Sequence, residues 1–344
     1  MITFSSSVLM QFAEDHKLMK NHCTVRIDPL TLVAKYIITD DVCVYQIEEL
    51  VVGDVYFDRD KEAVFSFFIP TFLNIINLSN KVKITYTEKT NIVEVSSIDK
   101  KFTVTIAADN NYIENPDIPF DITYSSLKPY SKMVKAIKVL KGLANDLMTT
   151  SEIEFGETLW TVSLQQCVLF GEASGIRGSM SSSLFEQIYN FEAEVGMASD
   201  SKAIVRGDYK NSKYYIIVPI KSKTNQYSES IPKMIALCKR KVCDCEITND
   251  VSSVVSNLLK SLKKEQVIIR FSNGRFDVTY DSIQWSLTTI NDKNVESISL
   301  KVPNKMLNPV LSIIESPTEV YTNNGGTICL MRDNLGMMLT GIAC

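Results

Sequence analysis

One short pattern of residues occurs three times along the 344-residue chain. In each copy Pro or Ser stands at the start of a short apolar segment, as expected for the first turn of a helix. These short helices are predicted at residues 69–76, 181–188 and 302–307. A recurrence of this kind constrains the fold strongly, because a chain of repeated units builds several similar cores instead of one.

Each copy also opens with a longer segment in which apolar residues recur at the helical period. Strand-like segments with turn residues between them lie on both sides of each short helix. The long helices are predicted at residues 5–20, 127–148 and 249–264. Strands are predicted at residues 24–26, 33–39, 82–87, 92–96, 102–107, 153–155, 158–170, 203–206, 214–220, 266–271, 275–287, 327–331 and 337–342.

The repeated order is helix, strands, short helix, strands, which is typical of an α+β protein. Polar, Pro-containing stretches at 108–120 and 219–232 separate the copies and are interpreted as linkers. We therefore predict three similar domains, at residues 1–112, 121–221 and 231–344, each with two helices packed on antiparallel sheets.

Lysines recur on the outer faces of the long helices, although the formal net charge of the chain is −4. On a helical wheel of residues 127–148, Met133 and Ile137 share an apolar face and the lysines lie opposite. The ordinary interpretation is a solvated face. No acidic residue lies between Lys128 and Lys141, so this helix lacks the Glu–Lys pairs, four residues apart, that stabilise an ordinary soluble helix. A basic face without such pairs favours a polyanionic partner. The lysines concerned are Lys17, Lys20, Lys128, Lys132, Lys135, Lys138, Lys260, Lys263 and Lys264.

Three features carry a resemblance to a known family: the tripled unit, the basic long helices and the C-terminal strand around Met337. The chain resembles the DNA polymerase sliding clamps of the three-domain bacterial type, or a divergent phage version of that type. The resemblance covers essentially the full length and implies the DNA clamp fold. It implies a homodimer whose six domains close a ring around double-stranded DNA, without regard to DNA sequence. Such a ring serves as a processivity factor, with a DNA polymerase and a clamp loader as its partners.

The resemblance also implies roles for individual residues. It implies that the lysines of the long helices line the channel, with Lys17 and Lys20 in a similar but weaker position. It implies that Met337, Met338 and Leu339 border an apolar pocket for partner peptides, with Tyr227 in the second linker as a weaker candidate. The alternative for the C-terminal residues is an ordinary buried edge strand.

Residues that would support catalysis or metal binding are sparse. The two histidines, His16 and His22, lie near Cys23 without a second group of ligands at suitable spacing. Cys238, Cys243 and Cys245 are better interpreted as buried thiols than as half of a metal site. The glycine-containing segment 171–178 lacks the Lys-Ser/Thr ending of a phosphate loop and is interpreted as a strand connection. We expect no enzyme activity, no cofactor and no metal.

The eight cysteines are scattered, which suits a reducing compartment, and the longest apolar run is too interrupted to cross a membrane. We therefore expect a protein of the bacterial cytoplasm or of the cytoplasm of an infected host. Three alternatives remain open at this stage. They are a monomeric DNA-binding processivity subunit, a structural β-rich assembly protein without a DNA role, and an enzyme with an unrecognised site.

Overall fold

The computed structural model describes most of the chain, and the statements below concern these residues. They are 6–28, 30–50, 62–76, 82–97, 102–107, 111–131, 133–135, 137, 152–156, 159–164, 167–172, 175–209, 212–222, 230–246, 266–272, 275–281, 283–288, 297–314, 317–323, 326–333 and 335–343.

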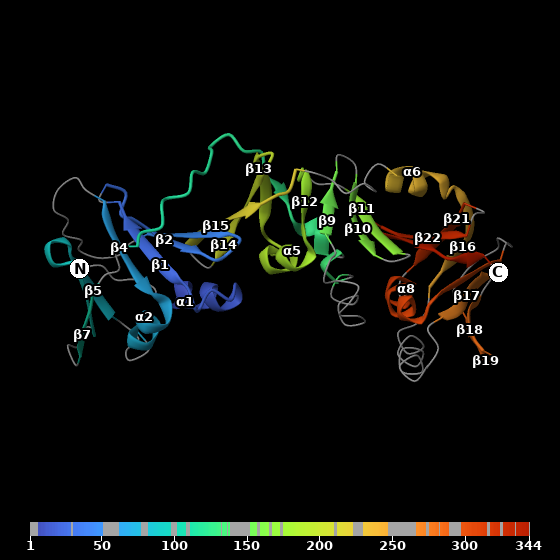
Figure 1. The fold of residues 1–344 in the computed structure, drawn as a ribbon, viewed down its shortest axis with the longest axis horizontal. Helices are drawn as coiled ribbons and strands as arrows, with labels where there is room; N and C mark the ends of the chain where they lie inside the picture. The colour runs from blue at the N-terminus through green and yellow to red at the C-terminus, as the bar shows by residue number, and fades with distance from the viewer. Residues whose placement is uncertain are drawn as a thin grey trace. The chain divides into compact units, whose positions relative to one another are not determined.

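The chain forms two compact units (Figure 1). Unit 1 comprises Met1–Ser126 and Glu192–Pro219, and unit 2 comprises Leu127–Phe191 and Ile220–Cys344. Residues of the second predicted repeat, 121–221, therefore contribute to both units. The three domain boundaries remain a prediction.

Unit 1 contains an eight-stranded antiparallel sheet in the order β4-β1-β2-β3-β15-β14-β13-β8. The central seam joins β3 to β15, where Ile47 pairs with Tyr214 although the two residues lie far apart in sequence. The strands of this sheet are β1 (His22–Ile27), β2 (Val33–Thr39), β3 (Val44–Leu50), β4 (Ala63–Phe68), β8 (Ser125–Ser126), β13 (Glu194–Ser199), β14 (Lys202–Tyr209) and β15 (Ser212–Pro219).

Unit 2 contains a sheet with the same topology, in the order β12-β9-β10-β11-β23-β22-β21-β16. Its seam joins β11 to β23, where Leu169 pairs with Met337. In both sheets, four strands of one predicted repeat continue into four strands of the next. The strands are β9 (Glu152–Phe155), β10 (Leu159–Leu164), β11 (Cys167–Glu172), β12 (Gly178–Ser181), β16 (Arg240–Cys245), β21 (Thr318–Thr322), β22 (Thr327–Arg332) and β23 (Leu335–Thr340).

Each unit also contains a smaller antiparallel sheet. In unit 1 its order is β5-β6-β7, and in unit 2 it is β19-β18-β17-β20-β24. The strands are β5 (Val82–Thr87), β6 (Ile92–Ser97), β7 (Thr103–Ala107), β17 (Gln266–Ser272), β18 (Arg275–Tyr280), β19 (Ile283–Thr288), β20 (Ile298–Pro303) and β24 (Ile342–Ala343).

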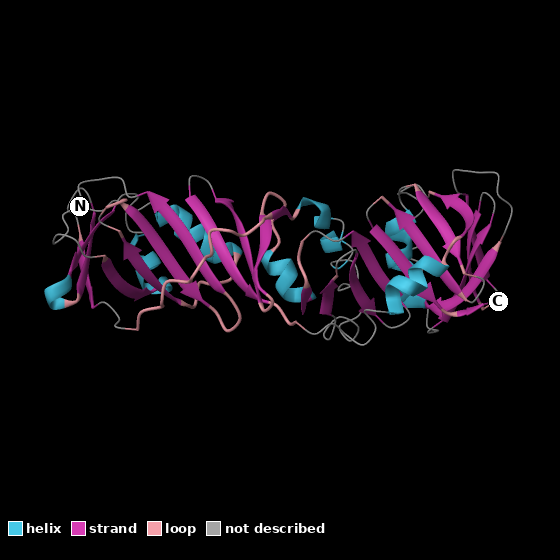
Figure 2. Cartoon of the chain, turned by 90° about the horizontal axis from the view of Figure 1, so that it is seen from above, coloured by secondary structure: helices cyan, strands magenta, loops and turns pink. Residues whose placement is uncertain are grey.

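Strands make up most of the regular structure, and short helices cover the sheets (Figure 2). The predicted helix at 69–76 is confirmed, and that at 181–188 is confirmed with Ser181 as its cap, since the Ser181 hydroxyl accepts a hydrogen bond from the Leu184 N–H at 3.2 Å. The helices are α1 (Ser6–Asp15), α2 (Ile69–Ile76), α5 (Ser182–Ile188), α6 (Ser230–Leu237) and α8 (Leu307–Ile314), with 3₁₀ turns η1 (Glu88–Thr90), η2 (Lys128–Tyr130) and η3 (Asn304–Met306).

Several predicted boundaries were wrong. The first helix ends at Asp15 and not at residue 20, because Lys17 adopts φ of 59° and Leu18 N–H returns to the Ala13 carbonyl at 2.7 Å. This left-handed cap position is usually occupied by Gly, and the Lys found there carries no recognisable stop signal for a helix. The third short helix, predicted at 302–307, begins as η3 and continues as α8 to Ile314. The predicted strands 158–170 and 275–287 are each two strands, and α6 begins inside the predicted second linker.

Helix α1 packs over the seam of the unit 1 sheet. The buried Phe12 ring lies 6.3 Å from Tyr45 on β3 and 5.6 Å from Tyr214 on β15, measured between ring centroids. Aromatic contacts of this kind bury large apolar areas, so α1 stabilises the junction between strands of two repeats. Within the described part of the chain, no helix is long and apolar enough to cross a membrane.

Candidate functional site

The two eight-stranded sheets can be compared residue by residue at their hairpins. In unit 1 the last pair of the β14–β15 hairpin is Tyr209 with Ser212, and in unit 2 the last pair of the β22–β23 hairpin is Arg332 with Leu335. Both hairpins therefore have the same loop length. Counting back from the loop, Arg206 corresponds to Cys329 and Tyr215 corresponds to Met338.

In unit 1 this row of the sheet is polar. Pairing places Gln46, Tyr215, Arg206 and Glu194 side by side across four strands. Arg206 forms an ion pair with Glu194 at 2.7 Å, and its guanidinium lies 3.6 Å from the centroid of the Tyr124 ring. A polar pocket of about 430 Å³ is lined by both members of this ion pair and by Tyr215.

In unit 2 the corresponding row is apolar. Pairing places Val168, Met338, Cys329 and Tyr321 side by side. We call the surrounding group the apolar cluster. Its buried members are Phe170, Cys238, Cys329 and Met338, and the half-buried side chains packed against them are Leu159, Val168, Met234, Ile235, Tyr321 and Met331.

Helix α6 forms one wall of the apolar cluster through Met234 and Ile235. In Figure 1, α6 lies on one side of β22 and α8 lies on the other. The half-buried side chains of α6 and of the sheet thus form an apolar surface on the face opposite α8. Because Met side chains are flexible and polarizable, such a surface can adapt to different peptides.

Gly336 allows the far end of the Phe170 ring to lie close to the backbone of β23. The two residues pair across the seam, and a Cβ at position 336 would collide with three atoms of that ring. A larger residue would push Phe170 away from the strand. The glycine therefore sets the position of the largest buried side chain in the apolar cluster.

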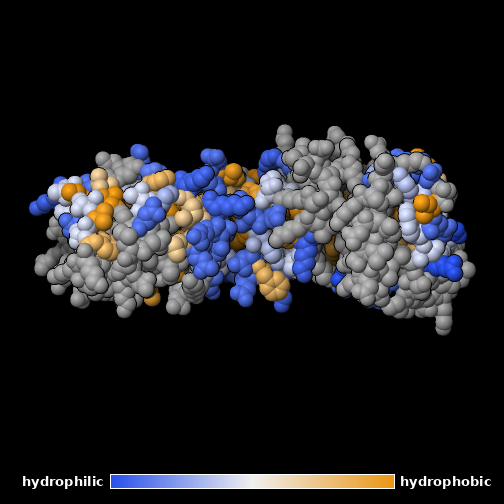
Figure 3. Space-filling model, turned by 90° about the horizontal axis from the view of Figure 1, so that it is seen from below, coloured by the Kyte–Doolittle hydropathy of each residue, from blue (hydrophilic) through white to orange (hydrophobic). Residues whose placement is uncertain are grey.

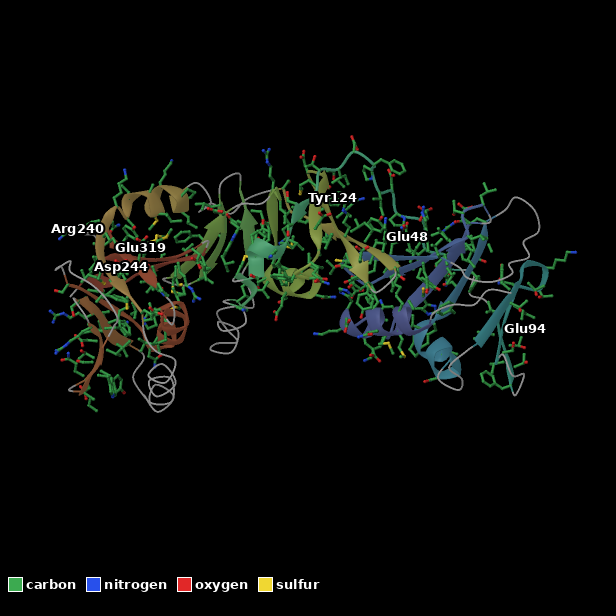
Figure 4. The ribbon with its side chains drawn as sticks, turned by 180° about the vertical axis from the view of Figure 1, so that it is seen from behind. Glu48, Glu94, Tyr124, Arg240, Asp244 and Glu319 are labelled. Atoms are coloured by element: carbon green, nitrogen blue, oxygen red, sulfur yellow. The ribbon has the colours of Figure 1, made fainter. Side chains whose placement is uncertain are left out.

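Charged side chains border the apolar cluster at the β16–β21 edge (Figure 4). The Lys241 ammonium lies 2.7 Å from the Glu319 carboxylate and 2.8 Å from that of Asp244. The Tyr321 hydroxyl donates a hydrogen bond to Glu319 at 2.9 Å. Hydrogen bonds from Lys241 and Tyr321 lower the pKa of Glu319, which stays ionised. An apolar centre with a charged rim is typical of protein–protein contact surfaces.

The predicted pocket residues on β23 do not share one face of the strand. Met338 belongs to the apolar cluster, whereas Met337 and Leu339 alternate to the opposite face of β23, where both are buried. The strand lies between β11 and β22, so it is not an edge strand. Tyr227 lies outside the described residues.

Two parts of the apolar cluster, α6 and Phe170, were not predicted from the sequence. The start of α6, Ser-Ile-Pro at 230–232, does carry a helix signal, since Pro is well tolerated in a first turn. This Pro is also the last residue of the predicted linker 219–232, so the two interpretations compete at this position. Phe170 carried no such local signal, because its environment depends on the pairing of β11 with β23.

The described lysines of the predicted basic faces are exposed. Lys17 and Lys20 lie in the turns after α1, and Lys128 lies in η2 with its ammonium 5.3 Å from the centroid of the Phe191 ring. Lys135 is exposed between the buried Met133 and Ile137, as the helical wheel predicts. Lys132, Lys138, Lys260, Lys263 and Lys264 lie outside the described residues. On the face drawn in Figure 3, hydrophobic side chains reach the surface only in small separate groups among hydrophilic ones.

The histidines and cysteines considered as metal ligands pack against aromatic rings or are buried. His16 packs on Phe12 at 4.4 Å between ring centroids, and His22 packs near Phe68. Cys23 is fully buried, and burial raises its pKa. Cys243 and Cys245 lie buried on one face of β16. Among the described residues, no group of three or more His, Cys, Asp or Glu could hold a metal ion.

The fold is similar to that of bacterial sliding clamps over the whole chain. DNA polymerase III subunit beta from Borrelia burgdorferi is 12% identical with a TM-score of 0.66, covering 99% of this chain and 98% of that one. The Helicobacter pylori beta clamp bound to a DNA ligase peptide is 11% identical with a TM-score of 0.68, covering 99% of both chains. The beta subunit from Streptococcus pyogenes is 9% identical with a TM-score of 0.68, covering 100% of both.

These similarities confirm the predicted DNA clamp fold, with its α+β composition. No protein-family model matches the sequence. No curated protein matches it either.

Proposed function

We propose that this chain is a DNA polymerase processivity factor, a sliding clamp without an active site of its own. Two copies close a six-domain ring around double-stranded DNA, and the apolar cluster binds a short peptide of the polymerase. A clamp loader opens the ring, and the protein works in the cytoplasm of a bacterium or of an infected host cell. One observation supports the proposal most strongly. Each half of the eight-stranded sheets has a counterpart in one of the two smaller sheets, where the strand that would form the seam has no partner on its outer side among the described strands.

The first half has a counterpart in the smaller sheet of unit 2, which also contains β24. In the order β20-β17-β18-β19, these strands correspond to β4-β1-β2-β3, so β19 corresponds to β3. The second half occurs alone in unit 1, where β5-β6-β7 corresponds to β13-β14-β15 and β7 corresponds to β15. Among the described strands, β19 and β7 have no neighbour on their outer sides.

Unpaired edge strands tend to pair with another chain. Since β3 pairs with β15 and β11 pairs with β23, the same rule pairs β19 of one copy with β7 of a second copy. Each copy offers one edge of each kind. Two such pairings related by a twofold axis close the assembly, so that neither β19 nor β7 remains unpaired in either copy.

The partner site is proposed at the apolar cluster and at no corresponding place in unit 1. The H. pylori clamp, which has this fold, binds a DNA ligase peptide. In this chain the unit 2 row carries Met338 and Cys329 where the unit 1 row carries Tyr215 and Arg206. An apolar peptide segment would bury half-exposed apolar surface around the first row. Over the second row it would remove water from the Arg206–Glu194 ion pair without replacing it. We therefore propose the half-buried Met234 as a contact for the polymerase, supported by the buried Met338 and Phe170 against which it packs. Met337, Leu339 and Tyr227 are retained only as neighbouring candidates.

The proposed DNA contacts are the lysines of the long helices. Lysine gives flexible contacts to phosphate, whereas reading of base edges favours arginine. Contacts of this kind depend on salt and not on base sequence. They hold the ring loosely on the duplex, while ring closure prevents its loss. Tethering then raises the effective concentration of the polymerase at the primer end.

Primer extension on a singly primed circular template tests this function. With the cognate polymerase and clamp loader, adding the chain should lengthen the products made in a single binding event. An unchanged product length, under conditions in which the polymerase alone is distributive, would contradict the proposal.

Reversal of charge at Lys132 and Lys135 should weaken DNA retention about tenfold at moderate salt, because log affinity changes with the number of phosphate contacts. The double variant Lys132→Glu, Lys135→Glu is compared with Lys202→Glu, Lys301→Glu, which alters two exposed lysines on strands β14 and β20. Salt-dependent elution from duplex DNA measures the effect. Equal elution of the two double variants would favour an ordinary solvated face.

A further inference from the structure

One exposed segment of unit 1 has the chemistry of a docking peptide. We call residues 111–123 the strap. The strap contains no helix or strand and runs to β13 on the side of unit 1 opposite α1 and α2 (Figure 1). Its Phe120 side chain is the most exposed large hydrophobic side chain of the described residues. A single exposed ring is ordinary in itself, so the surroundings of Phe120 decide what the ring can do.

Both ends of the strap are fixed to the large sheet of unit 1. Near its start, the Ile113 N–H donates a hydrogen bond to the buried Thr24 hydroxyl on β1 at 2.9 Å. Near its end, the Ile122 side chain and the Thr123 carbonyl lie against Gly196 on β13, where a Cβ would collide with both. The strap is therefore an anchored segment that presents Phe120, and not a loose tail.

The strap is also preorganised and acidic. Pro116 and Pro119 fix two φ angles and remove two N–H donors, which favours the extended conformation that peptide grooves accept. An extended segment with fixed angles loses little conformational entropy when it binds. Its charged side chains are all acidic, namely Glu114, Asp117 and Asp121. The surface that fits such a segment is apolar and has exposed cations beside it.

The apolar cluster of unit 2 has this complementary chemistry. On α6 the half-buried Met234 offers an adaptable apolar contact. The segment from Ser230 to Lys241, which contains α6, carries four basic residues and no acidic one. Lys233 directly precedes Met234, and Lys239 lies between α6 and β16. Both lysines are exposed and form no ion pair within the described part of the chain.

Two carboxylates, those of Asp244 and Glu319, also border this surface. The Lys241 ammonium lies between them, 2.8 Å from the first and 2.7 Å from the second. Their charge is thus already offset within the protein, and a basic ligand would have to compete with Lys241. Lys233 and Lys239 are the cations that an acidic ligand would meet.

We propose that the strap of one copy docks on the apolar cluster of a second copy, with Phe120 against Met234 and the strap carboxylates facing Lys233 and Lys239. This inference rests on the proposed function of the apolar cluster as a peptide site. A second copy suffices as the partner, because this chain carries both complementary surfaces. The contact is heterologous, so rings associate further as their concentration rises. A polymerase peptide on the apolar cluster excludes the strap and separates the rings.

Binding of a labelled synthetic peptide of residues 111–123 to the full chain tests the contact directly. One aromatic anchor in a short segment gives a weak site, so we expect a dissociation constant of about 0.1 mM. Replacement of Phe120 by Ala in the peptide should weaken binding about tenfold. Met234→Lys in the chain should weaken binding similarly although it adds a positive charge, because it removes the apolar contact. Unchanged affinity after both changes would overturn the proposal.

A pair of charge-reversed variants tests the role of the lysines. The double variant Lys233→Glu, Lys239→Glu should weaken binding of the strap peptide about tenfold at low salt and less at high salt. The control Lys202→Glu, Lys301→Glu makes the same change of charge on β14 and β20 and should change affinity less than about twofold. Equal losses in the two double variants would mean that only the overall charge matters, and would contradict the proposed contact.

Competition with a DNA ligase peptide, the kind bound by the H. pylori clamp, separates this inference from the proposed function. An excess of the unlabelled ligase peptide should displace the strap peptide. Binding of the ligase peptide without binding of the strap peptide would refute this inference and leave the peptide site standing. Absence of binding of either peptide would contradict both. Strap binding that neither the ligase peptide nor Met234→Lys reduces would place the strap on another surface and refute the inference.

Sedimentation velocity tests the contact between intact copies. Above about 0.1 mM the natural protein should form species larger than the proposed two-copy ring, and Phe120→Asp should not. Leu30→Asp changes another highly exposed apolar side chain of unit 1 and should associate like the natural protein. Absence of larger species in the natural protein, or their loss in both variants, would overturn the proposal.

Discussion

The variant Ile283→Asp is expected to convert the protein from a dimer to a monomer at micromolar concentration. Ile283 begins β19 and is 52% exposed, so the exchange should leave the fold of the unit intact. In the dimer the same position would be buried beside β7 of the second copy, where an unpaired carboxylate is costly. We expect the dimer to weaken by about a hundredfold or more.

A matched control comes from the other edge of the same sheet. Ile342 on β24 is 66% exposed, and Ile342→Asp places the same charge on a strand that pairs with β20. Sedimentation equilibrium should give twice the chain mass of 38.7 kDa for the natural protein and for Ile342→Asp, and a single chain mass for Ile283→Asp. Dissociation by Ile342→Asp alone would place the subunit contact at the β24 edge and would contradict the proposed contact at β19.

The variant Met234→Lys should reduce peptide affinity by about a hundredfold, as expected for a residue at the centre of a small contact surface. Met234 is half-buried against the apolar cluster, so the ammonium would point into the surface that the peptide occupies. Isothermal titration with the DNA ligase peptide measures the loss. Ring formation should not change, because α6 is not part of β7 or β19.

The control is Ala236→Lys on the same helix, at an exposed position. It adds the same charge two residues away and should change peptide affinity less than about threefold. Thermal unfolding of both variants checks that α6 remains folded. Similar losses of peptide affinity in Met234→Lys and Ala236→Lys would contradict the proposed site. They would mean that any positive charge added to α6 weakens binding, whether or not the residue packs against the apolar cluster.

Elements with a strong local period could be predicted from the sequence. Residues 82–87 and 33–39 were predicted with the bounds that β5 and β2 have, because both segments are rich in β-branched and aromatic residues. The short helix 69–76 was predicted equally well from its Pro and its apolar period. The order of these elements was enough to identify the fold.

Features that depend on distant pairing could not be predicted. The seams join Tyr214 to Ile47 and Met337 to Leu169, and no local pattern in these strands specifies the partner. The candidate site depends on the second seam, which brings Phe170 to the strand of Met338. Met338 was therefore found through the resemblance, whereas Phe170 and Cys329 were found only from the sheet register.

The most direct test of the proposed function is retention on circular DNA. The protein is loaded onto nicked plasmid circles by a clamp loader, the salt concentration is raised, and the fraction that elutes with DNA is measured before and after one restriction cut. A closed ring should stay on the circles at a salt concentration that removes simple lysine–phosphate contacts, and should be lost once the DNA is linear. Equal retention on circular and linear DNA would contradict encirclement.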